Sequence, residues 1–461
     1  MLSKRICTVM RKALLPALAL TFALPALAAA DSRFDAQTLE KAARRACPVA
    51  QGILLGATGK CPVTNLQRRV LAGNIVEYTF DVRLGPGPYD VLGFHRVVRE
   101  SAPSQPIHTQ DSVFLLHGDI WDFRAAFLAD PGRNLPVFLA RNGVDVWGID
   151  QRWVRVPASE TDFAFMKDWG FQHDIRDLYV SLGMARGTRA LTGNGWSRMH
   201  LLGWSRGGMI GYAYLNTESQ LPLGLRNVDG FIPVDIYMKT NDEEFRQAAC
   251  RRSEAEEASY VAGQYQNASG TLVQTIATLA ATNPTGASPV FPGLTNHQAA
   301  LLVGEATFVI FPPDQQPVPF YHFTGGTFAA APAPSGLPVP TGLLYSPEAA
   351  WMALLGGAAP YQAARQLADA DLVICDEEDV PFDDHLDDIT NPVLYVGAGG
   401  GFGEYGIYTT TLLGSTDVTT RVVDLTPPDQ RLSDFGHADL FLGTDAGMLV
   451  WRPILNWIRA H

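Results

Sequence analysis

Ser205 lies in the pentapeptide Gly-Trp-Ser-Arg-Gly at 203–207, which follows a short apolar stretch and precedes a helical run at 209–215. Glycine two residues before and two residues after a serine permits a tight turn between a strand and a helix, where larger side chains would collide with neighbouring backbone. A chain with 43 glycines could contain this spacing by chance. Because a strand precedes it and a helix follows it, we predict a nucleophilic serine at a strand end.

A serine hydroxyl needs a base before it becomes a strong nucleophile, and a histidine on a late loop can supply one. Of the ten histidines, His437 is the best placed, because it lies just beyond the last predicted strand, 420–424. Gly436 allows a tight loop that directs the imidazole toward the strand ends. An exposed loop histidine is the alternative interpretation. The upstream Ser205 favours a catalytic base.

Short apolar strands that alternate with helices must position these two residues. The expected strands are 74–84, 89–99, 113–116, 144–149, 199–203, 228–234, 392–396 and 420–424, and the expected helices are 136–142, 171–191, 207–216 and 447–459. The first two strands are joined by Gly-Pro-Gly-Pro at 85–88, which is typical of an antiparallel hairpin. The remaining strands are apolar throughout, which predicts a mostly parallel eight-stranded sheet with helices on both faces.

Residues between the sixth and seventh expected strands do not show this alternation of apolar strands and helices. They contain helical stretches at 242–266 and 347–371, separated by sequence rich in proline and glycine. We therefore predict a core at 31–235 and 392–461 with an inserted cap at 236–391. The cap contains six aromatic residues that either line an apolar acyl pocket or form the core of the cap. They are Phe308, Phe311, Phe320, Tyr321, Phe323 and Phe328.

Residues 1–30 have the composition of a secretory signal peptide. Four basic residues lie within 1–12, and 13–30 is almost wholly apolar and ends in three alanines. An uncleaved anchor is the alternative, but the two prolines and the small residues at the end favour cleavage and a secreted or periplasmic protein. No later stretch is long and apolar enough to span a bilayer. Cleavage would lower the net charge from −12 to about −16, which argues against a nucleic-acid partner.

Four cysteines remain after removal of the signal peptide. In an exported protein an even number favours disulfides, and local pairing predicts Cys47 with Cys61 and Cys250 with Cys375. Buried free thiols are the alternative. The spacing of cysteine and histidine does not favour a metal site.

These motifs resemble those of the α/β-hydrolase superfamily over residues 74–235 and 392–459. The resemblance is carried by His-Gly at 117–118 after the third expected strand, the serine pentapeptide after the fifth, and Gly-His at 436–437 after the eighth. Residues 135–152 and 166–182 also resemble gastric-type acid lipases, with Arg206 as a departure from the residue usual after the nucleophile.

The resemblance implies an oxyanion hole formed by the backbone N–H groups of Arg206 and Asp119. A carboxylate at Asp119 would repel a developing oxyanion unless it turns away. The resemblance also implies an acid after the seventh strand, where Glu404 is the carboxylate available; Asp235, after the sixth strand, is the alternative. His117 is expected to pack and to hydrogen-bond locally.

Residues 401–406 also fit the Gly-x-Gly-x-x-Gly spacing of dinucleotide-binding loops. That motif belongs after the first strand of a nucleotide-binding domain, whereas this one lies near the end of the chain. We expect a loop that bends around the catalytic centre, and neither an organic cofactor nor a metal. The acidic run at 376–388 lacks the spacing of a calcium loop and is expected to be a solvated surface.

The sequence therefore predicts an exported serine hydrolase that cleaves small carboxylic esters with an apolar acyl or alcohol group. A peptidase, amidase, thioesterase or acyltransferase with the same triad is the alternative among enzymes. A catalytically silent hydrolase fold used for binding is the alternative outside them. The candidate nucleophile, base and oxyanion positions favour the enzyme.

Overall fold

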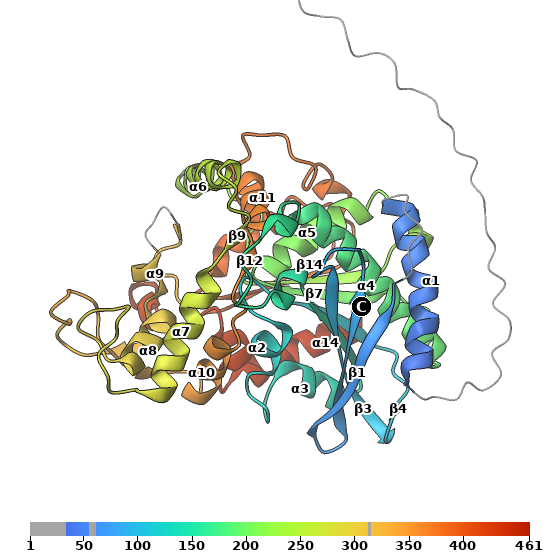
Figure 1. The fold of residues 1–461 in the computed structure, drawn as a ribbon, viewed down its shortest axis with the longest axis horizontal. Helices are drawn as coiled ribbons and strands as arrows, with labels where there is room; N and C mark the ends of the chain where they lie inside the picture. Colours follow the sequence, from blue (N-terminus) through green and yellow to red (C-terminus); the bar gives the residue numbers. More distant parts are fainter. Residues whose placement is uncertain (1–33, 55–60, 312–314) are drawn as a thin grey trace, which may run out of the picture. The chain divides into compact units, whose positions relative to one another are not determined.

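A mixed β-sheet forms the centre of the computed structural model, which describes residues 34–54, 61–311 and 315–461, except for the side chains of 47–54 (Figure 1). Within these residues the sheet has ten strands. They are β1 (Val63–Ala72), β2 (Ile75–Arg83), β3 (Val91–Ala102), β4 (Gln105–Pro106), β5 (Ser112–Leu116), β6 (Asp145–Asp150), β7 (Met199–Trp204), β8 (Val228–Val234), β13 (Val393–Ala398) and β14 (Val418–Val423).

The order across the sheet is β1-β2-β3-β6-β5-β7-β8-β13-β14, and β4 pairs with β3. Neighbouring strands run parallel from β6 to β14 and antiparallel from β1 to β6. Every residue of β5, β6 and β7 is buried, as expected for strands covered on both faces. The eight predicted strands are all present. The sheet has ten strands instead of the expected eight, because sequence analysis missed β1 and the two-residue strand β4. Most side chains of β1 are exposed and it has no continuous apolar run.

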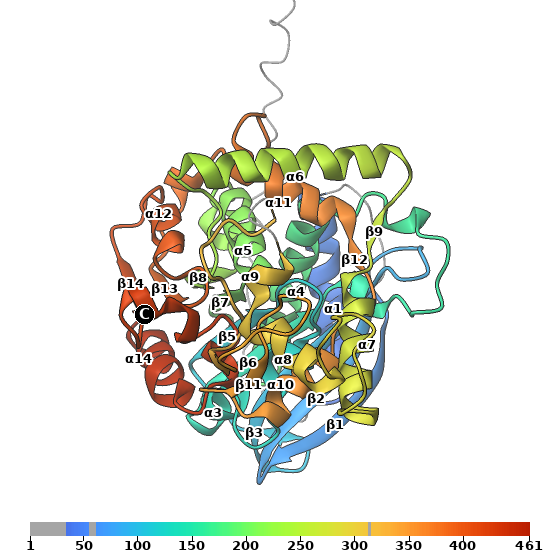
Figure 2. The same ribbon diagram turned by 90° about the vertical axis from the view of Figure 1, so that its left-hand side faces the viewer.

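Helices cover both faces of the sheet (Figures 1 and 2). One face packs against α1 (Ala36–Leu54), α4 (Phe171–Leu191) and α5 (Arg206–Glu218). The other face packs against α2 (Phe123–Leu128), α3 (Leu135–Arg141) and α14 (Arg452–Ala460). Alternate residues of β5 enter the two cores, Phe114 on the first face and Leu115 on the second, as the period of a strand requires.

The residues between β8 and β13, 236–391, are called the insertion segment below. Its elements are α6 (Glu243–Val261), β9 (Gln266–Asn267), α7 (Ser269–Thr282), α8 (Asn296–Glu305), α9 (Thr307–Ile310), β10 (Gly326–Phe328), β11 (Pro340–Leu343), α10 (Glu348–Gly356), β12 (Gln362–Ala363) and α11 (Ala364–Cys375). The helix expected at 347–371 is divided into α10 and α11. Pro360 lies between the two helices, and a proline cannot continue a helix interior.

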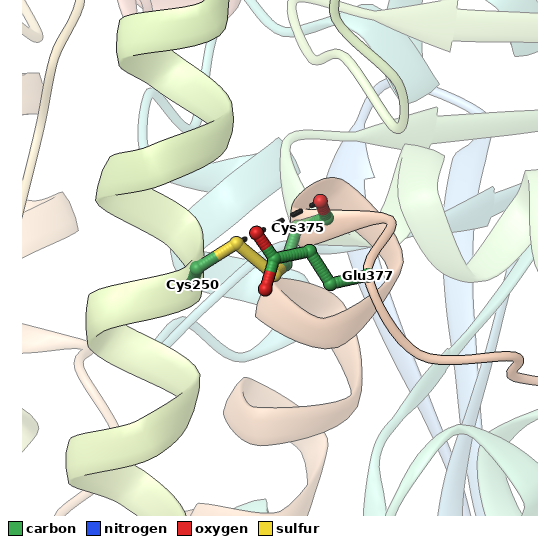
Figure 3. Close-up of side chains that lie close together, drawn as sticks. All are labelled: Cys250, Cys375 and Glu377. Atoms are coloured by element: carbon green, nitrogen blue, oxygen red, sulfur yellow. Dashed lines mark hydrogen bonds between the residues drawn. A yellow bond between two sulfur atoms is a disulfide. The ribbon is translucent and has the colours of Figure 1, made fainter.

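Contacts of α6 and α11 hold the insertion segment together and attach it to the core. Cys250 on α6 and Cys375 at the end of α11 form a disulfide, as predicted (Figure 3). Arg252 forms an ion pair with Asp371 between the same helices. Asp369 on α11 accepts a hydrogen bond of 2.8 Å from the N–H of Phe171, and so satisfies the first turn of α4 in the core.

Two predictions concern residues that the structure does not describe. The predicted signal peptide at 1–30 lies outside the described residues. The side chain of Cys47 also lies outside them, so the pairing of Cys47 with Cys61 stays a prediction. Among the helices that are described, none has the length and apolar character needed to cross a bilayer.

Candidate active site

Ser205 forms the turn between β7 and α5, with φ of 55° and ψ of −130°. Its N–H donates to Val234 O at 2.9 Å, which holds the turn against β8. A Cβ on Gly203 would lie 2.3 Å from Gly207 O, and a Cβ on Gly207 would lie 2.3 Å from Leu116 O. Both glycines of the pentapeptide are therefore required by close backbone contacts, as the sequence pattern predicts.

His437 lies on the loop between β14 and α13 (Asp439–Leu442), and its side chain is buried. Two main-chain bonds attach this loop to the insertion segment: His437 N donates to His322 O at 3.1 Å and Ala438 N donates to Phe323 O at 2.7 Å. Next to the imidazole, the Asp439 carboxylate accepts a bond of 2.8 Å from Gly436 N and one of 2.9 Å from Gly325 N of the insertion segment. The loop that carries the imidazole is therefore held by its own Asp439 and by the insertion segment.

The carboxylate that contacts His437 belongs to Asp235, at the end of β8. Asp235 Oδ2 lies 2.6 Å from His437 Nδ1, and both side chains are buried. The same carboxylate accepts hydrogen bonds from the backbone N–H groups of Ala398 at 2.8 Å, Phe402 at 3.1 Å and Gly403 at 2.9 Å. Asp235 is thus held in one orientation by three donors and the imidazole.

Glu404, the acid we placed first, does not contact the imidazole. It lies on a 3₁₀ turn, Gly403–Gly406, with an exposed side chain that makes no hydrogen bond or ion pair among the described residues. The geometry therefore favours the alternative acid, Asp235. The loop after β13 contributes N–H donors to Asp235 instead of a carboxylate, because its glycines bring the backbone close to that side chain. A Cβ on Gly401 would lie 2.0 Å from Asp235 Oδ2.

This packing also accounts for the Gly-x-Gly-x-x-Gly spacing at 401–406. Gly406, the last of its three glycines, lies against Tyr395, where a Cβ would be 2.2 Å from the phenolic oxygen. Gly403 has φ of 51°, a conformation that glycine adopts without strain. The motif is a loop wrapped around Asp235, as the preferred interpretation of the sequence had it.

Trp204 is next to Ser205 in the sequence and in contact with His437. The Trp204 indole stacks on the imidazole with ring centroids 5.0 Å apart, and Ser205 follows Trp204 directly. Within the described residues neither Ser205 Oγ nor His437 Nε2 makes a hydrogen bond. Because Asp235 accepts a bond at Nδ1, the proton of the neutral ring is held there, and Nε2 is left as an acceptor for a serine proton.

The backbone N–H groups considered for an oxyanion hole belong to Arg206 and Asp119. Arg206 is the first residue of α5, where an N–H has no partner within the helix. Among the described residues, neither Arg206 N nor Asp119 N donates a hydrogen bond. Gly118 packs directly on the nucleophile, since a Cβ there would lie 2.7 Å from Ser205 Cβ. The loop after β5 therefore lies beside Ser205.

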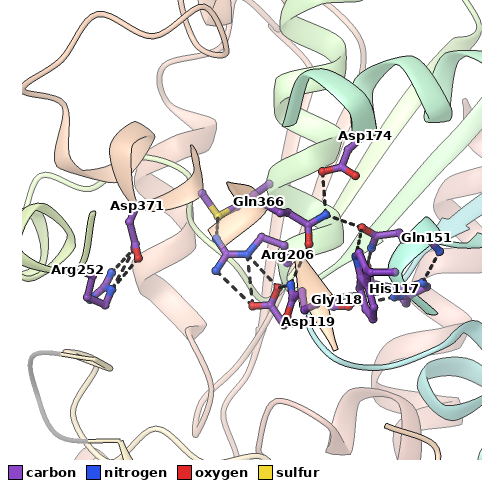
Figure 4. Close-up of polar contacts among 12 residues, drawn as sticks. His117, Gly118, Asp119, Gln151, Asp174, Arg206, Arg252, Gln366 and Asp371 are labelled. Atoms are coloured by element: carbon purple, nitrogen blue, oxygen red, sulfur yellow. Dashed lines mark hydrogen bonds and ion pairs between the residues drawn. The ribbon is translucent and has the colours of Figure 1, made fainter. Parts of the chain in front are cut away.

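The Asp119 side chain forms an ion pair with the Arg206 side chain (Figure 4). Arg206 Nε donates to Asp119 Oδ1 at 3.1 Å, and Gln362 Nε2 donates to the same oxygen at 2.5 Å. The negative charge at this position is thus compensated by the neighbouring guanidinium. The Asp119 carboxylate is therefore paired with a cation and with an amide donor.

His117 has a local structural role, as expected. Its Nδ1 donates to Gly118 O at 3.0 Å, and its Nε2 accepts from Gln151 N at 3.2 Å. Burial lowers the pKa of this imidazole. Because both nitrogens are occupied, His117 supports the loop that carries Asp119 and is not available as a base.

Aromatic rings surround His437 on the sides not taken by Asp235. Tyr321 and Phe323 of the insertion segment have ring centroids 5.6 and 5.4 Å from the imidazole, and Phe402 lies at 5.6 Å. The other four aromatics singled out in the sequence are not among these neighbours, and Phe311 and Phe320 are exposed. The insertion segment thus supplies apolar surface beside the imidazole.

Metal ligation is not supported by the side chains that the structure describes. Three side chains have potential ligand atoms close enough to share a metal ion: Cys250, Cys375 and Glu377. The two sulfur atoms are bonded to each other, so neither is available as a thiolate (Figure 3).

Sequence analysis missed the hydrogen bonds of three buried glutamines, Gln151, Gln362 and Gln366. They link the loop after β5 to the insertion segment. No sequence signal identifies them, because a buried glutamine has no characteristic spacing.

No family model and no curated protein matches this chain. Among solved structures, it is similar to a candidate lipase from Sulfolobus solfataricus, with 18% identity and a TM-score of 0.58 over 86% of this chain and 99% of the other. A soluble variant of monoglyceride lipase from Saccharomyces cerevisiae has 13% identity and a TM-score of 0.42, covering 88% and 98% of the two chains.

A thermophilic esterase from Thermogutta terrifontis has 14% identity and a TM-score of 0.38, covering 80% of this chain and 93% of its own. The architecture shared with the Sulfolobus protein is that of the α/β-hydrolases. This chain therefore has the α/β-hydrolase fold, as the sequence predicted. At these identities the likeness defines the fold, and the chemistry must be argued from the site.

Proposed function

We propose that this protein is an exported serine hydrolase that cleaves carboxylic esters. The observation that carries the proposal is the buried hydrogen bond of 2.6 Å between Asp235 and His437, beside the strained turn that presents Ser205. In this proposal Asp235, His437 and Ser205 act as acid, base and nucleophile, which follow one another along the chain in the order Ser-Asp-His of α/β-hydrolases. The half-buried Ser205 remains accessible from solvent.

In the proposed reaction, Ser205 Oγ attacks the ester carbonyl carbon while its proton moves to His437 Nε2. Arg206 N–H and Asp119 N–H donate to the carbonyl oxygen as it becomes negative. When the carbon–oxygen ester bond breaks, the imidazolium gives its proton to the departing alcohol. Water then attacks the acyl-enzyme by the same route and releases the acid. Asp235 stabilises the imidazolium in both halves.

The aromatic side chains beside His437 favour a substrate with an apolar acyl or alcohol group. Tyr321 and Phe323 come from the insertion segment, which would act as a cap that selects the substrate. Export is supported by the N-terminal composition and by the Cys250–Cys375 disulfide, since disulfides persist in oxidising compartments.

The first test is covalent labelling of the purified protein with a fluorophosphonate probe. Wild type is expected to label with one probe per chain and to hydrolyse p-nitrophenyl esters. Ser205→Ala is expected to do neither while it keeps the wild-type thermal unfolding transition. Ser104→Ala is a suitable control, because Ser104 also has a positive φ but lies on the loop between β3 and β4. A folded wild-type protein that does not label would overturn the proposal.

The second test is a panel of p-nitrophenyl esters of increasing acyl length, with matched anilides and thioesters. Ester turnover that exceeds amide turnover and rises with acyl length is the expected result. A preference for the anilides would replace the esterase proposal with an amidase. Fractionation of expressing cells tests export, with cytoplasmic retention of the full-length chain as the contradicting outcome.

A further inference from the structure

Residues 358–362 of the insertion segment contact the loop after β5 at three successive positions. Ala358 forms an antiparallel bridge with Trp121, and Ala359 N donates to Ile120 O at 2.6 Å. Gln362 Nε2 donates to Asp119 Oδ1 at 2.5 Å. The segment therefore runs alongside the loop whose N–H group at Asp119 would bind the oxyanion.

The loop adopts a conformation that its own sequence does not favour. Ile120 has φ of 55°. A β-branched residue rarely adopts this left-handed conformation, and such a residue persists only where its surroundings hold it in place. The Ile120 carbonyl accepts a hydrogen bond from Ala359 of the insertion segment. The preceding residue, Asp119, accepts one from Gln362. The contacts with 358–362 are therefore suited to hold the strained loop.

The amide of Gln362 is itself fixed by a buried network (Figure 4). Gln362 is 1% exposed, and its Nε2 also donates to Gln366 Oε1 at 2.9 Å. Gln366 Nε2 donates in turn to Gln151 Oε1 at 2.6 Å and to Asp174 Oδ2 at 2.8 Å. Because Gln151 and Asp174 belong to the core, the direction of the Gln362 amide is set from the core as well as from the insertion segment.

We propose that Gln362 is a positioning residue, which aims the Asp119 N–H at the oxyanion by holding the Asp119 side chain. Gln362 acts through Asp119 and does not touch the substrate carbonyl. Arg206 holds the same carboxylate from the other side, so the aspartate is fixed between the nucleophile helix and the insertion segment. The insertion segment would thereby complete the oxyanion hole as well as cover the substrate. This inference rests on the proposed serine hydrolase function.

The test is steady-state hydrolysis of a p-nitrophenyl ester by Gln362→Met, which keeps the length of the side chain and removes the amide. An interaction needed only in the transition state lowers kcat and leaves KM nearly unchanged. We expect kcat to fall about 10-fold, less than the loss of a direct oxyanion donor, which is about 100- to 1,000-fold. Fluorophosphonate labelling of Ser205 should still reach one probe per chain. Gln264→Met, at an exposed glutamine of the insertion segment, should retain the wild-type kcat.

A charge exchange separates positioning from general destabilisation. Gln362→Glu places two carboxylates together and should lower kcat at least as much as Gln362→Met. In the double variant Asp119→Asn with Gln362→Glu, the amide at 119 donates and the carboxylate at 362 accepts, so the hydrogen bond is restored in the opposite direction. The kcat of this double variant should be within about 3-fold of the kcat of Asp119→Asn alone. If Gln362→Met does not fold, this exchange decides the question, and failure to recover overturns the proposal.

The remaining outcomes distinguish this inference from the function on which it rests. If wild type neither labels nor hydrolyses esters, the proposed function fails. If wild type is active and Gln362→Met keeps the wild-type kcat, or loses activity through KM alone, the positioning role is overturned while the serine hydrolase stands.

Discussion

The carboxylate of Asp119 and the guanidinium of Arg206 are joined by three contacts of 3.1 to 3.3 Å. The backbone N–H groups of the same two residues have no acceptor within the described part of the chain. The ion pair is only partly exposed, with 14% of the Arg206 side chain and 34% of the Asp119 side chain accessible. Because screening by water is incomplete there, removal of one partner leaves an uncompensated charge near the reacting carbonyl.

Arg206→Met should therefore lower kcat although its backbone N–H is retained. The unpaired Asp119 carboxylate would repel the developing oxyanion, and we expect a loss of about 10- to 100-fold. Asp119→Asn in the Arg206→Met background should recover most of the loss, because it removes the repelling charge. Hydrolysis of p-nitrophenyl esters measures both. Arg198→Met is the matched control, since it breaks the ion pair with Asp229 at the opposite end of β7. Equal activity of the single and double variants would contradict this account.

The two candidate acids make a second prediction. Asp235→Asn cannot accept the imidazole N–H in the same way, and loss of the corresponding acid in a serine triad lowers kcat by roughly four orders of magnitude. Glu404→Gln should stay within about 2-fold of wild type, because the exposed Glu404 side chain does not contact His437. Single-turnover kinetics with a p-nitrophenyl ester checks the chemical step. Loss of activity in Glu404→Gln but not in Asp235→Asn would restore the original assignment.

The acid shows where sequence reasoning was limited. Order along the chain identified the loop at 397–406 as part of the site, and the structure places its backbone against Asp235. Order alone could not tell a loop that supplies the carboxylate from a loop that supplies N–H donors to one. That difference depends on which backbone groups approach within hydrogen-bond distance, and glycine spacing only permits such an approach.

Elements with strong local signals were predicted well. Parallel strands such as β5 and β13 are buried apolar runs, and α4 was predicted at 171–191, the bounds that the structure gives. The polar strand β1 was not predicted, because it depends on tertiary pairing with β2. The division between α10 and α11 was not predicted, because the break between the two helices is short. Gln362 carries no local signal, since its importance arises from contact with a loop more than 200 residues earlier in the chain.

Asp439 should make stability depend on pH. Burial raises the pKa of its carboxyl to about 7 from an ordinary value of 3.8. The folded state therefore holds this proton more tightly than the unfolded chain, so the resulting stability is full below about pH 4 and is lost as the pH rises through about 7. The free energy of unfolding should fall by at most about 1.4 kcal/mol per pH unit from this group.

Asp439→Asn is isosteric and cannot ionise, so it should flatten this dependence. Urea unfolding of wild type and variant between pH 4.5 and 8 measures the difference in slope. The amide oxygen can still accept from Gly436 N and Gly325 N, so the His437 loop should stay in place and activity at pH 6 should be preserved. Parallel curves for the two proteins would show that Asp439 does not titrate in this range.

The Cys250–Cys375 disulfide should contribute strongly to global stability. It joins residues 125 apart in sequence, and a cross-link that closes so long a loop removes much of the conformational freedom of the unfolded chain. Replacing both cysteines with serine should lower the free energy of unfolding by about 2–5 kcal/mol, measured by urea denaturation under oxidising conditions. Each single serine variant should lose a similar amount, because either substitution removes the same bond. A double variant as stable as wild type would mean that the Arg252–Asp371 pair and the packing of α6 on α11 hold the insertion segment without the disulfide.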